Sequence, residues 1–263
     1  MPTARKKQTK PDRILITGAS GELGAALARR YAAPGTALLL WGRDIPRLTR
    51  IAEECRRAGA DCSIRSLDLA DAAGAVAAIE AEDDAAPIAL AIFAAGVGDI
   101  CADAALVEDP AQVVRLALVN FVAPCAMAAA LADRMAKRRR GAIVLIGSAA
   151  AFYDLPFATA YAGSKAGLAR FAQALRIGVA VHGVHVMLAS PGFIDTAAGR
   201  RVAGPKPLLM QPADVAERIA SAVAKRQPHL ILPRTFALLR IVVALLPRRL
   251  RDRLLLGLTP ATN

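Results

Sequence analysis

The chain has 263 residues, of which 55% are apolar, and its 34 Lys and Arg outnumber its 22 Asp and Glu to give a formal charge of +12. This length and apolar content can bury the core of one α/β domain. The four cysteines show no Cys-x-x-Cys spacing and the three histidines are scattered. The composition therefore argues against a metal site and favours free thiols in a reducing cytoplasm.

Residues 1–11 are polar and basic and contain no apolar stretch, so we expect a flexible tail rather than a signal peptide. From residue 12 to residue 235, strand-like apolar runs alternate with helical segments. The expected strands lie at 13–17, 36–41, 61–66, 88–93, 141–147, 184–190 and 229–232, and the expected helices near 22–32, 45–58, 71–83, 110–138, 159–180 and 212–226. This alternation predicts one Rossmann-type α/β domain, a doubly wound parallel sheet of about seven strands with helices on both faces.

The first expected strand runs into the turn Gly18-Ala-Ser-Gly21-Glu-Leu-Gly24, which an alanine-rich helix follows. A strand, a glycine turn and a helix in this order aim free backbone N–H groups and the positive end of the helix at a phosphate. The alternative is a tight turn that binds nothing. The place of the turn at the start of an alternating chain favours the phosphate site.

Tyr161 and Lys165 stand four residues apart in Tyr-Ala-Gly-Ser-Lys. In a helix the two side chains share one face, one turn apart. A fixed ammonium beside a phenol is expected to lower its pKa from the ordinary value of about 10. The pair therefore predicts a tyrosine that gives or takes a proton near neutral pH.

Taken together, these motifs resemble the short-chain dehydrogenase/reductase superfamily, in its shorter single-domain type, over residues 12 to 232. The motifs that carry the resemblance are Thr17-Gly18-x-x-x-x-x-Gly24, Asp68-Leu69, Asn120, Ser148, Tyr161-x-x-x-Lys165 and Pro191-Gly-Phe-Ile-Asp-Thr196, in the order of the family. The resemblance implies that Tyr161 is the general acid/base and that Lys165 lowers its pKa and holds the nicotinamide ribose. It also implies that Ser148 donates to the carbonyl oxygen and that Asn120 supports a proton relay through water.

By the same resemblance, the expected cofactor-binding residues are Gly18, Ser20, Gly21, Leu23, Gly24, Arg43, Asp68, Leu69, Ala95, Gly96, Tyr161, Lys165, Pro191, Gly192, Ile194 and Thr196. The position at which NAD-dependent relatives carry a ribose-binding acid falls on Gly42, and Arg43 follows it. Because a guanidinium matches a 2′-phosphate, we expect NADP(H) in preference to NAD(H). The alternatives are that Arg43 is a solvated charge while Asp44 binds the ribose, and that Asp68 caps the next helix instead of binding the adenine amine.

Two departures from the family pattern stand out. Glu22 occupies the usual place of the middle glycine, with Gly21 one position earlier, a spacing closer to that of sugar-nucleotide-modifying relatives. Phe93-Ala-Ala-Gly96 replaces the common Asn-Asn-Ala-Gly, so the bonds of two side-chain amides must be made in another way.

Signals for the substrate come from two segments. Residues 197–211 are expected to cover the site, and there Arg200, Arg201 and Lys206 could attract an anionic group or belong to a solvated, mobile loop. Apolar side chains between the serine and the tyrosine could line an apolar pocket or pack beneath that loop; these are Phe152, Tyr153, Leu155 and Phe157.

Residues 236–263 form a C-terminal extension that is apolar and basic. Its first run, residues 236–246, is too short for the about 20 residues of a membrane span, and leucines and arginines alternate after Pro247. We expect helices that pack against another subunit of a homo-oligomer (a dimer or tetramer) or, as the second choice, bind a membrane peripherally. Nucleic acid is not an expected partner, because the basic residues show no aromatic interleaving.

The sequence thus predicts an NADP(H)-dependent oxidoreductase that interconverts a ketone and a secondary alcohol, working as a reductase in the cytoplasm. One alternative is a catalytically weak protein that senses NADP(H). Another, suggested by Gly21, is a sugar-nucleotide-modifying enzyme that retains its cofactor.

Overall fold

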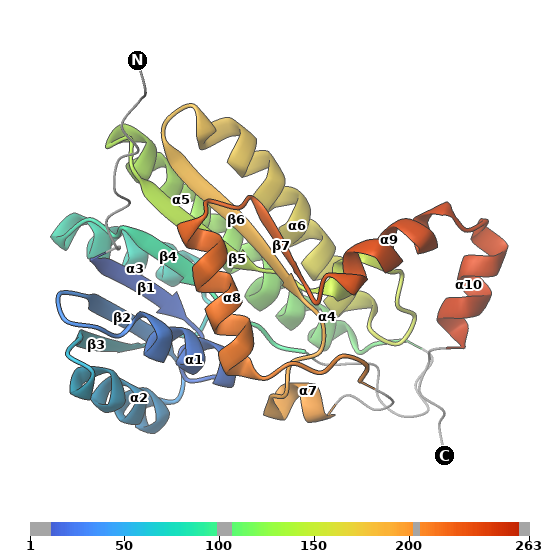
Figure 1. Ribbon diagram of the computed structural model, residues 1–263, viewed down its shortest axis with the longest axis horizontal. Helices are drawn as coiled ribbons and strands as arrows, with labels where there is room; N and C mark the ends of the chain where they lie inside the picture. Colours follow the sequence, from blue (N-terminus) through green and yellow to red (C-terminus); the bar gives the residue numbers. More distant parts are fainter. Residues whose placement is uncertain (1–11, 99–106, 202–205, 258–263) are drawn as a thin grey trace.

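Seven parallel strands form one sheet in the order β3-β2-β1-β4-β5-β6-β7 (Figure 1). The computed structural model describes residues 12–98, 107–201 and 206–257, so the expected basic tail at 1–11 lies outside the described residues. The strands are β1 (Arg13–Thr17), β2 (Ala37–Gly42), β3 (Asp61–Ser66), β4 (Leu90–Phe93), β5 (Gly141–Ile146), β6 (Val184–Pro191) and β7 (His229–Leu232). The chain moves outward from β1 to β3 and then returns to the other side of β1 at β4. The doubly wound sheet is confirmed, and its strand order reverses between β1 and β4.

Helices cover both faces of the sheet. They are α1 (Glu22–Tyr31), α2 (Ile45–Arg57), α3 (Ala72–Ala85), α4 (Pro110–Ala117), α5 (Ala123–Lys137), α6 (Thr159–Ala180), α7 (Ala197–Arg201), α8 (Pro212–Ala224), α9 (Thr235–Leu245) and α10 (Arg248–Leu256). Side chains of α1, α2 and α8 share one buried cluster with the strands, whereas α3, α5 and α6 share the other. The central strands β1, β2, β4, β5 and β6 therefore read as nearly continuous apolar runs, as expected when both faces of a parallel sheet are covered, whereas the edge strand β3 is mostly polar and exposed.

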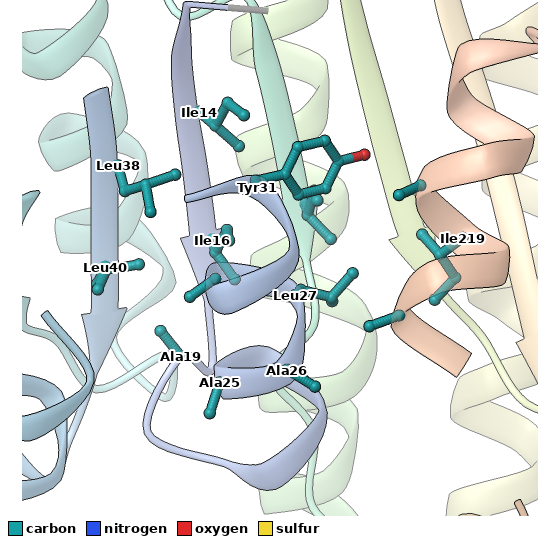
Figure 2. Close-up of a cluster of buried hydrophobic side chains, with 14 of the residues drawn as sticks. Ile14, Ile16, Ala19, Ala25, Ala26, Leu27, Tyr31, Leu38, Leu40 and Ile219 are labelled. Atoms are coloured by element: carbon teal, nitrogen blue, oxygen red, sulfur yellow. The ribbon is translucent and has the colours of Figure 1, made fainter. Parts of the chain in front are cut away.

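The core beneath the glycine turn anchors β1 and α1. Leu27 and Tyr31 of α1 lie over Ile14 and Ile16 of β1, as Figure 2 shows, and all four are buried. Complete burial of an aliphatic side chain of this size stabilises the fold by about 1.5–3 kcal/mol. The turn that joins the two elements is consequently held between rigid supports.

The expected helix at 110–138 is confirmed as one helical run, Pro110–Lys137, but a π-helical turn (Leu118–Val122) interrupts its regular α-helical bonding between α4 and α5. In this turn the Ala123 N–H donates to the carbonyl of Leu118, five residues back. The physical reason is Pro124, which lacks the N–H that the Asn120 carbonyl would accept in an α-helix. Asn120 is therefore presented from a widened turn rather than from a regular helix.

The run Pro110–Lys137 is long and apolar enough to cross a bilayer by length and composition, the one such run in the described ranges. In this structure 44% of its most apolar window is buried. Met127 and Leu131 within it belong to the core beside the sheet. The run is thus accounted for as a core helix of the domain.

Candidate active site

The glycine turn after β1 is packed too tightly for side chains at two of its positions. Gly18 has φ +67°, and a Cβ there would lie 2.6 Å from Ala95 Cα. A Cβ on Gly24 would lie 2.2 Å from the carbonyl oxygen of Gly18. These contacts bring the turn, the start of α1 and the loop after β4 together, at the point where the strand order reverses.

The first turn of α1 has no side-chain cap, since its N-cap residue is Gly21. By contrast, aspartates cap the helices that follow: Asp44 for α2, Asp71 for α3 and Asp109 for α4. Backbone N–H groups in an uncapped first turn are available to an anion, and the helix dipole favours negative charge there. The turn from Gly18 to Gly24 fits a phosphate.

The end of β2 excludes a ribose-binding carboxylate at residue 42. A Cβ on Gly42 would lie 2.7 Å from Ser20 Oγ, so a side chain there would displace the glycine turn. The Asp44 carboxylate accepts the Arg47 N–H at 3.0 Å as the cap of α2. The exposed Arg43 guanidinium makes no hydrogen bond or ion pair with any described residue. The alternative in which Asp44 binds the ribose would therefore compete with the use of the same carboxylate as the cap of α2.

At the end of β3, the exposed Asp68 accepts the Ala70 N–H at 3.0 Å, while Leu69 is buried beside it. The helix cap is Asp71, which accepts the Gly74 N–H at 2.9 Å. The alternative in which Asp68 caps α3 is therefore wrong.

The loop after β4 is held by hydrogen bonds with two side chains, those of Thr17 and Asn120. The Thr17 hydroxyl accepts the Ala95 N–H at 3.3 Å. Buried Asn120 accepts the Val97 N–H and donates to the Val97 carbonyl, both at 2.9 Å. A Cβ on Gly96 would lie 3.2 Å from Asn120 Oδ1 and 3.4 Å from Lys165 Nζ, so the loop touches two of the expected catalytic residues.

Tyr161 and Lys165 lie one turn apart in α6, as the spacing predicts. The Lys165 side chain is 4% exposed, and its Nζ lies 6.0 Å from the centre of the Tyr161 ring. The same ammonium donates to the Ile146 carbonyl at the end of β5, at 3.0 Å. The lysine is thus fixed between the end of the sheet and the tyrosine.

Burial governs the acidity of this pair. It lowers the pKa of Lys165 to about 8 and raises the pKa of Tyr161, while a hydrogen bond with the Ser148 side chain opposes the rise. The predicted lowering of the tyrosine pKa is wrong for this protein, because desolvation of the phenolate is the largest effect and the Ser148 hydrogen bond opposes it only in part. Tyr161 therefore keeps its proton at neutral pH.

Ser148 follows β5 and is also buried. Its hydroxyl accepts the Ala150 N–H at 3.1 Å and so caps the 3₁₀ turn Ala149–Phe152. The structure brings Ser148, Asn120, Tyr161 and Lys165 together at the carboxyl edge of the sheet, beside the glycine turn.

No group of three His, Cys, Asp or Glu within the described ranges could hold a metal ion.

A family model described as short chain dehydrogenase matches residues 12–205. The chain belongs to the short-chain dehydrogenase family. Its members named among the relatives are oxidoreductases and dehydrogenases, and this short-chain dehydrogenase is accordingly an enzyme with a nicotinamide-nucleotide-binding Rossmann fold.

Two relatives and one solved structure illustrate the similarity. An uncharacterized oxidoreductase of Myxococcus xanthus is 30% identical over 240 residues, which cover 90% of this chain and 94% of the relative. Estradiol 17-beta-dehydrogenase 11 of Rattus norvegicus is 27% identical over 252 residues, 94% of this chain and 84% of the relative. A short-chain dehydrogenase from Sphingobium yanoikuyae, solved in complex with NADPH, has a TM-score of 0.77 at 27% identity and covers 90% of this chain and 96% of its own.

The segment after β6 in this short-chain dehydrogenase is tied to the glycine turn. Glu22 accepts the Ala197 N–H at 2.8 Å and pairs with Arg200 at 3.2 Å. Arg200 also pairs with Asp195 at 2.7 Å, so two carboxylates compete with any anionic substrate for its guanidinium. Glu22, at the position of the missing middle glycine, thus ties together the two segments that are expected to bind the cofactor.

The other residues of this segment that were expected to bind the cofactor are held by contacts within the protein. Pro191 ends β6, and the Gly192 N–H donates to the Leu232 carbonyl at 2.7 Å. Ile194 pairs with Met210 across an isolated bridge, and the Thr196 hydroxyl accepts the Gly199 N–H at 3.0 Å. The expected loop at 197–211 therefore begins as the short helix α7.

Glu108 is a residue of this short-chain dehydrogenase that sequence reasoning missed. The α6 helix, which carries Tyr161 and Lys165, has no cap of its own at Ala158. Instead, the buried Glu108 carboxylate accepts the Ala160 N–H at 2.7 Å and the Thr159 hydroxyl. In the sequence, Glu108 lies just before Pro110 and indicates only where α4 begins. Its role as the cap of α6 could not be read from that position, because the residue it caps is more than fifty residues away.

We expect Glu108→Ala to lower the free energy of unfolding by about 1–3 kcal/mol, because the partly buried Ala160 N–H loses its acceptor. Glu108→Gln should lose less, since its amide oxygen can still accept that N–H. Chemical denaturation measures both, with the exposed Glu53→Ala as a control that should change stability by less than about 0.5 kcal/mol. Equal stability of the two Glu108 variants and the parent chain would contradict the capping role.

Proposed function

We propose that this chain is an NADP(H)-dependent oxidoreductase that interconverts a ketone and a secondary alcohol and works as a reductase. One observation carries the proposal. Tyr161, hydrogen-bonded to Ser148 and one helical turn from buried Lys165, lies at the sheet edge where the glycine turn is placed to bind a dinucleotide.

Each residue of the set has a chemical role in the proposal. Tyr161 holds a proton at its hydroxyl and delivers it to the substrate oxygen, and its raised pKa suits an acid that must stay protonated at neutral pH. Ser148 donates a hydrogen bond to the same oxygen as negative charge develops. Lys165 fixes the tyrosine helix against the end of β5, and Asn120, which donates to Ser164 of that helix, ties it to the loop after β4. The bound nicotinamide supplies the hydride.

The residues that would hold the cofactor follow from the same geometry. The uncapped start of α1 would take the pyrophosphate, and Asp68 and Leu69 the adenine. The unpaired guanidinium of Arg43, together with the closed position at Gly42, favours a 2′-phosphate. These features support NADP(H) over NAD(H).

We expect Arg43→Gln to weaken NADPH binding about 10- to 100-fold and to leave NADH binding within about twofold, because a charge-assisted contact contributes about 1.5–3 kcal/mol. Fluorescence titration with each nucleotide measures both dissociation constants. Arg50→Gln, an exposed change on α2, is the control. Equal losses for the two nucleotides would contradict a 2′-phosphate contact.

The proposed substrate class is an apolar ketone or alcohol. The name of the rat relative, estradiol 17-beta-dehydrogenase, describes the oxidation of a secondary alcohol on an apolar molecule. The aromatic pair Phe152 and Tyr153, directly after the Ser148 turn, would suit such a substrate. Because the family typically forms oligomers, we include a homo-oligomer in the proposal.

A panel of carbonyl compounds, assayed by the loss of NADPH absorbance, tests the function. Turnover of apolar ketones with NADPH would support it. A protein that binds NADPH and turns over no member of the panel would be a sensor instead. Turnover of a sugar nucleotide without net consumption of NADPH would favour the third possibility.

A further inference from the structure

The two C-terminal helices together expose six leucine side chains. We name as the extension face the exposed residues Leu238, Leu239, Leu245, Leu250, Leu254 and Leu256, together with Arg249 and Arg253. Leu245 is 80% exposed and Leu238 is 66% exposed, and the two lie two turns apart on the same side of α9. An exposed apolar cluster of this kind marks an interaction surface.

The helices that carry the extension face are docked on the domain. Val243 and Leu255 are buried. The Arg240 guanidinium lies 4.8 Å from the centre of the Phe152 ring, and Arg251 pairs with Asp154 at 3.6 Å. In Figure 1, α9 and α10 project from the carboxyl side of the sheet, away from the strands. The leucines are therefore displayed by folded helices that are fixed to the Ser148–Tyr161 segment.

The extension face also carries positive charge that the protein leaves unpaired. Arg248 and Arg251 each contact an acid, since they pair with Asp252 and Asp154. The guanidinium groups of Arg249 and Arg253, one turn apart on the outward side of α10, have no hydrogen bond or ion pair with any described residue. Leu250 and Leu254 lie beside them at the same helical spacing. The surface is thus apolar and cationic at once.

We propose that the extension face docks on an anionic phospholipid bilayer. Leucines at the boundary of headgroups and acyl chains remove apolar area from water, and arginines extend their charged ends to the lipid phosphates. The formal charge of +12 adds a long-range attraction to the same surface. With 11 residues in α9, about 16 Å at 1.5 Å per residue, the helix lies on the bilayer rather than across it.

Charge decides between a bilayer and a second copy of the chain. In a two-fold dimer through this face, each Arg249 and Arg253 would meet the same surface of the partner. The acids of α10 are limited to Asp252, which is already shared by Arg248 and Arg251. An anionic bilayer offers an apolar environment to the leucines and phosphate groups to the arginines, and it does not bring like charges together. This inference concerns docking alone and does not depend on the proposed reaction.

Flotation of the full chain with lipid vesicles tests the proposal. We expect binding to phosphatidylcholine vesicles that contain phosphatidylglycerol and little binding to phosphatidylcholine alone. Each arginine near an anionic surface raises the partition by about fivefold, so Arg249→Gln with Arg253→Gln should lower it by about 25-fold. Leu250→Ser with Leu254→Ser should lower it as well. Arg50→Gln with Arg218→Gln removes the same charge elsewhere and should lower it far less.

Light scattering of the same variants, without lipid, separates docking from assembly. Unchanged oligomer mass together with lost flotation supports the bilayer. Flotation that is equal in the Arg249 and Arg253 variant and in its charge-matched control would overturn the proposal, as would failure of the parent chain to float. A loss of oligomer mass in the leucine variant would also overturn it, because the face would then be a subunit contact.

Discussion

Replacing Tyr161 by Phe is expected to reduce kcat about 10²–10⁴-fold on whichever carbonyl substrate the panel identifies, because the only change is the loss of the hydroxyl that carries the proton. The ring remains in α6, and Lys165 keeps its bond to the Ile146 carbonyl. The dissociation constant for NADPH should therefore change by less than about threefold. Steady-state kinetics and nucleotide titration on the same preparation measure the two effects separately.

Tyr31→Phe is the matched control for that variant. Its hydroxyl is buried in the α1 core without a hydrogen-bond partner, and Figure 2 shows the ring over β1, within the apolar cluster. Removing this hydroxyl should leave kcat unchanged and stability equal or slightly higher, since no bond is lost. If Tyr161→Phe retained kcat within about fivefold of the parent chain, the proton role proposed for Tyr161 would be lost.

The fold was predictable from the sequence because its signals are local. Apolar runs that end in glycine or polar residues located all seven strands, and β1 begins and ends at the expected residues. The widened turn around Asn120 was not predicted, although Pro124 is a visible signal for it. A proline removes one helical donor wherever it stands, but whether the chain ends, kinks or forms a π turn depends on the packing around it.

The clustering of the candidate site residues was predictable from the sequence, and the electrostatics of that cluster were less so. The spacing of Tyr161 and Lys165 located the pair, yet the direction of the tyrosine pKa depends on how much water the fold removes, which spacing does not report. The roles of Glu108 and Arg200 come from partners 52 and 178 residues away, respectively. Such pairings follow from the topology of the whole sheet, and no local pattern reports them.

Of the substitutions that add one methyl group to the turn between β1 and α1, Gly24→Ala is expected to be the most damaging. A Cβ at this position would lie 2.2 Å from the Gly18 carbonyl oxygen and 2.8 Å from Ala19 Cα, and both of these neighbours are backbone atoms that cannot rotate away. Either α1 shifts on β1 or the turn opens. We expect a loss of about 1–3 kcal/mol in the free energy of unfolding, the cost of overpacking a well-filled core.

The same shift should weaken NADPH binding by more than tenfold, because the N–H groups of the turn would no longer converge on one phosphate. Gly178→Ala makes the identical change in α6, where a Cβ meets no atom within 4 Å, and it should stabilise the helix by about 0.5–1 kcal/mol. Denaturation curves and NADPH titrations of both variants measure the contrast. If Gly24→Ala bound NADPH as tightly as Gly178→Ala, the phosphate would have to bind elsewhere than in the turn between β1 and α1.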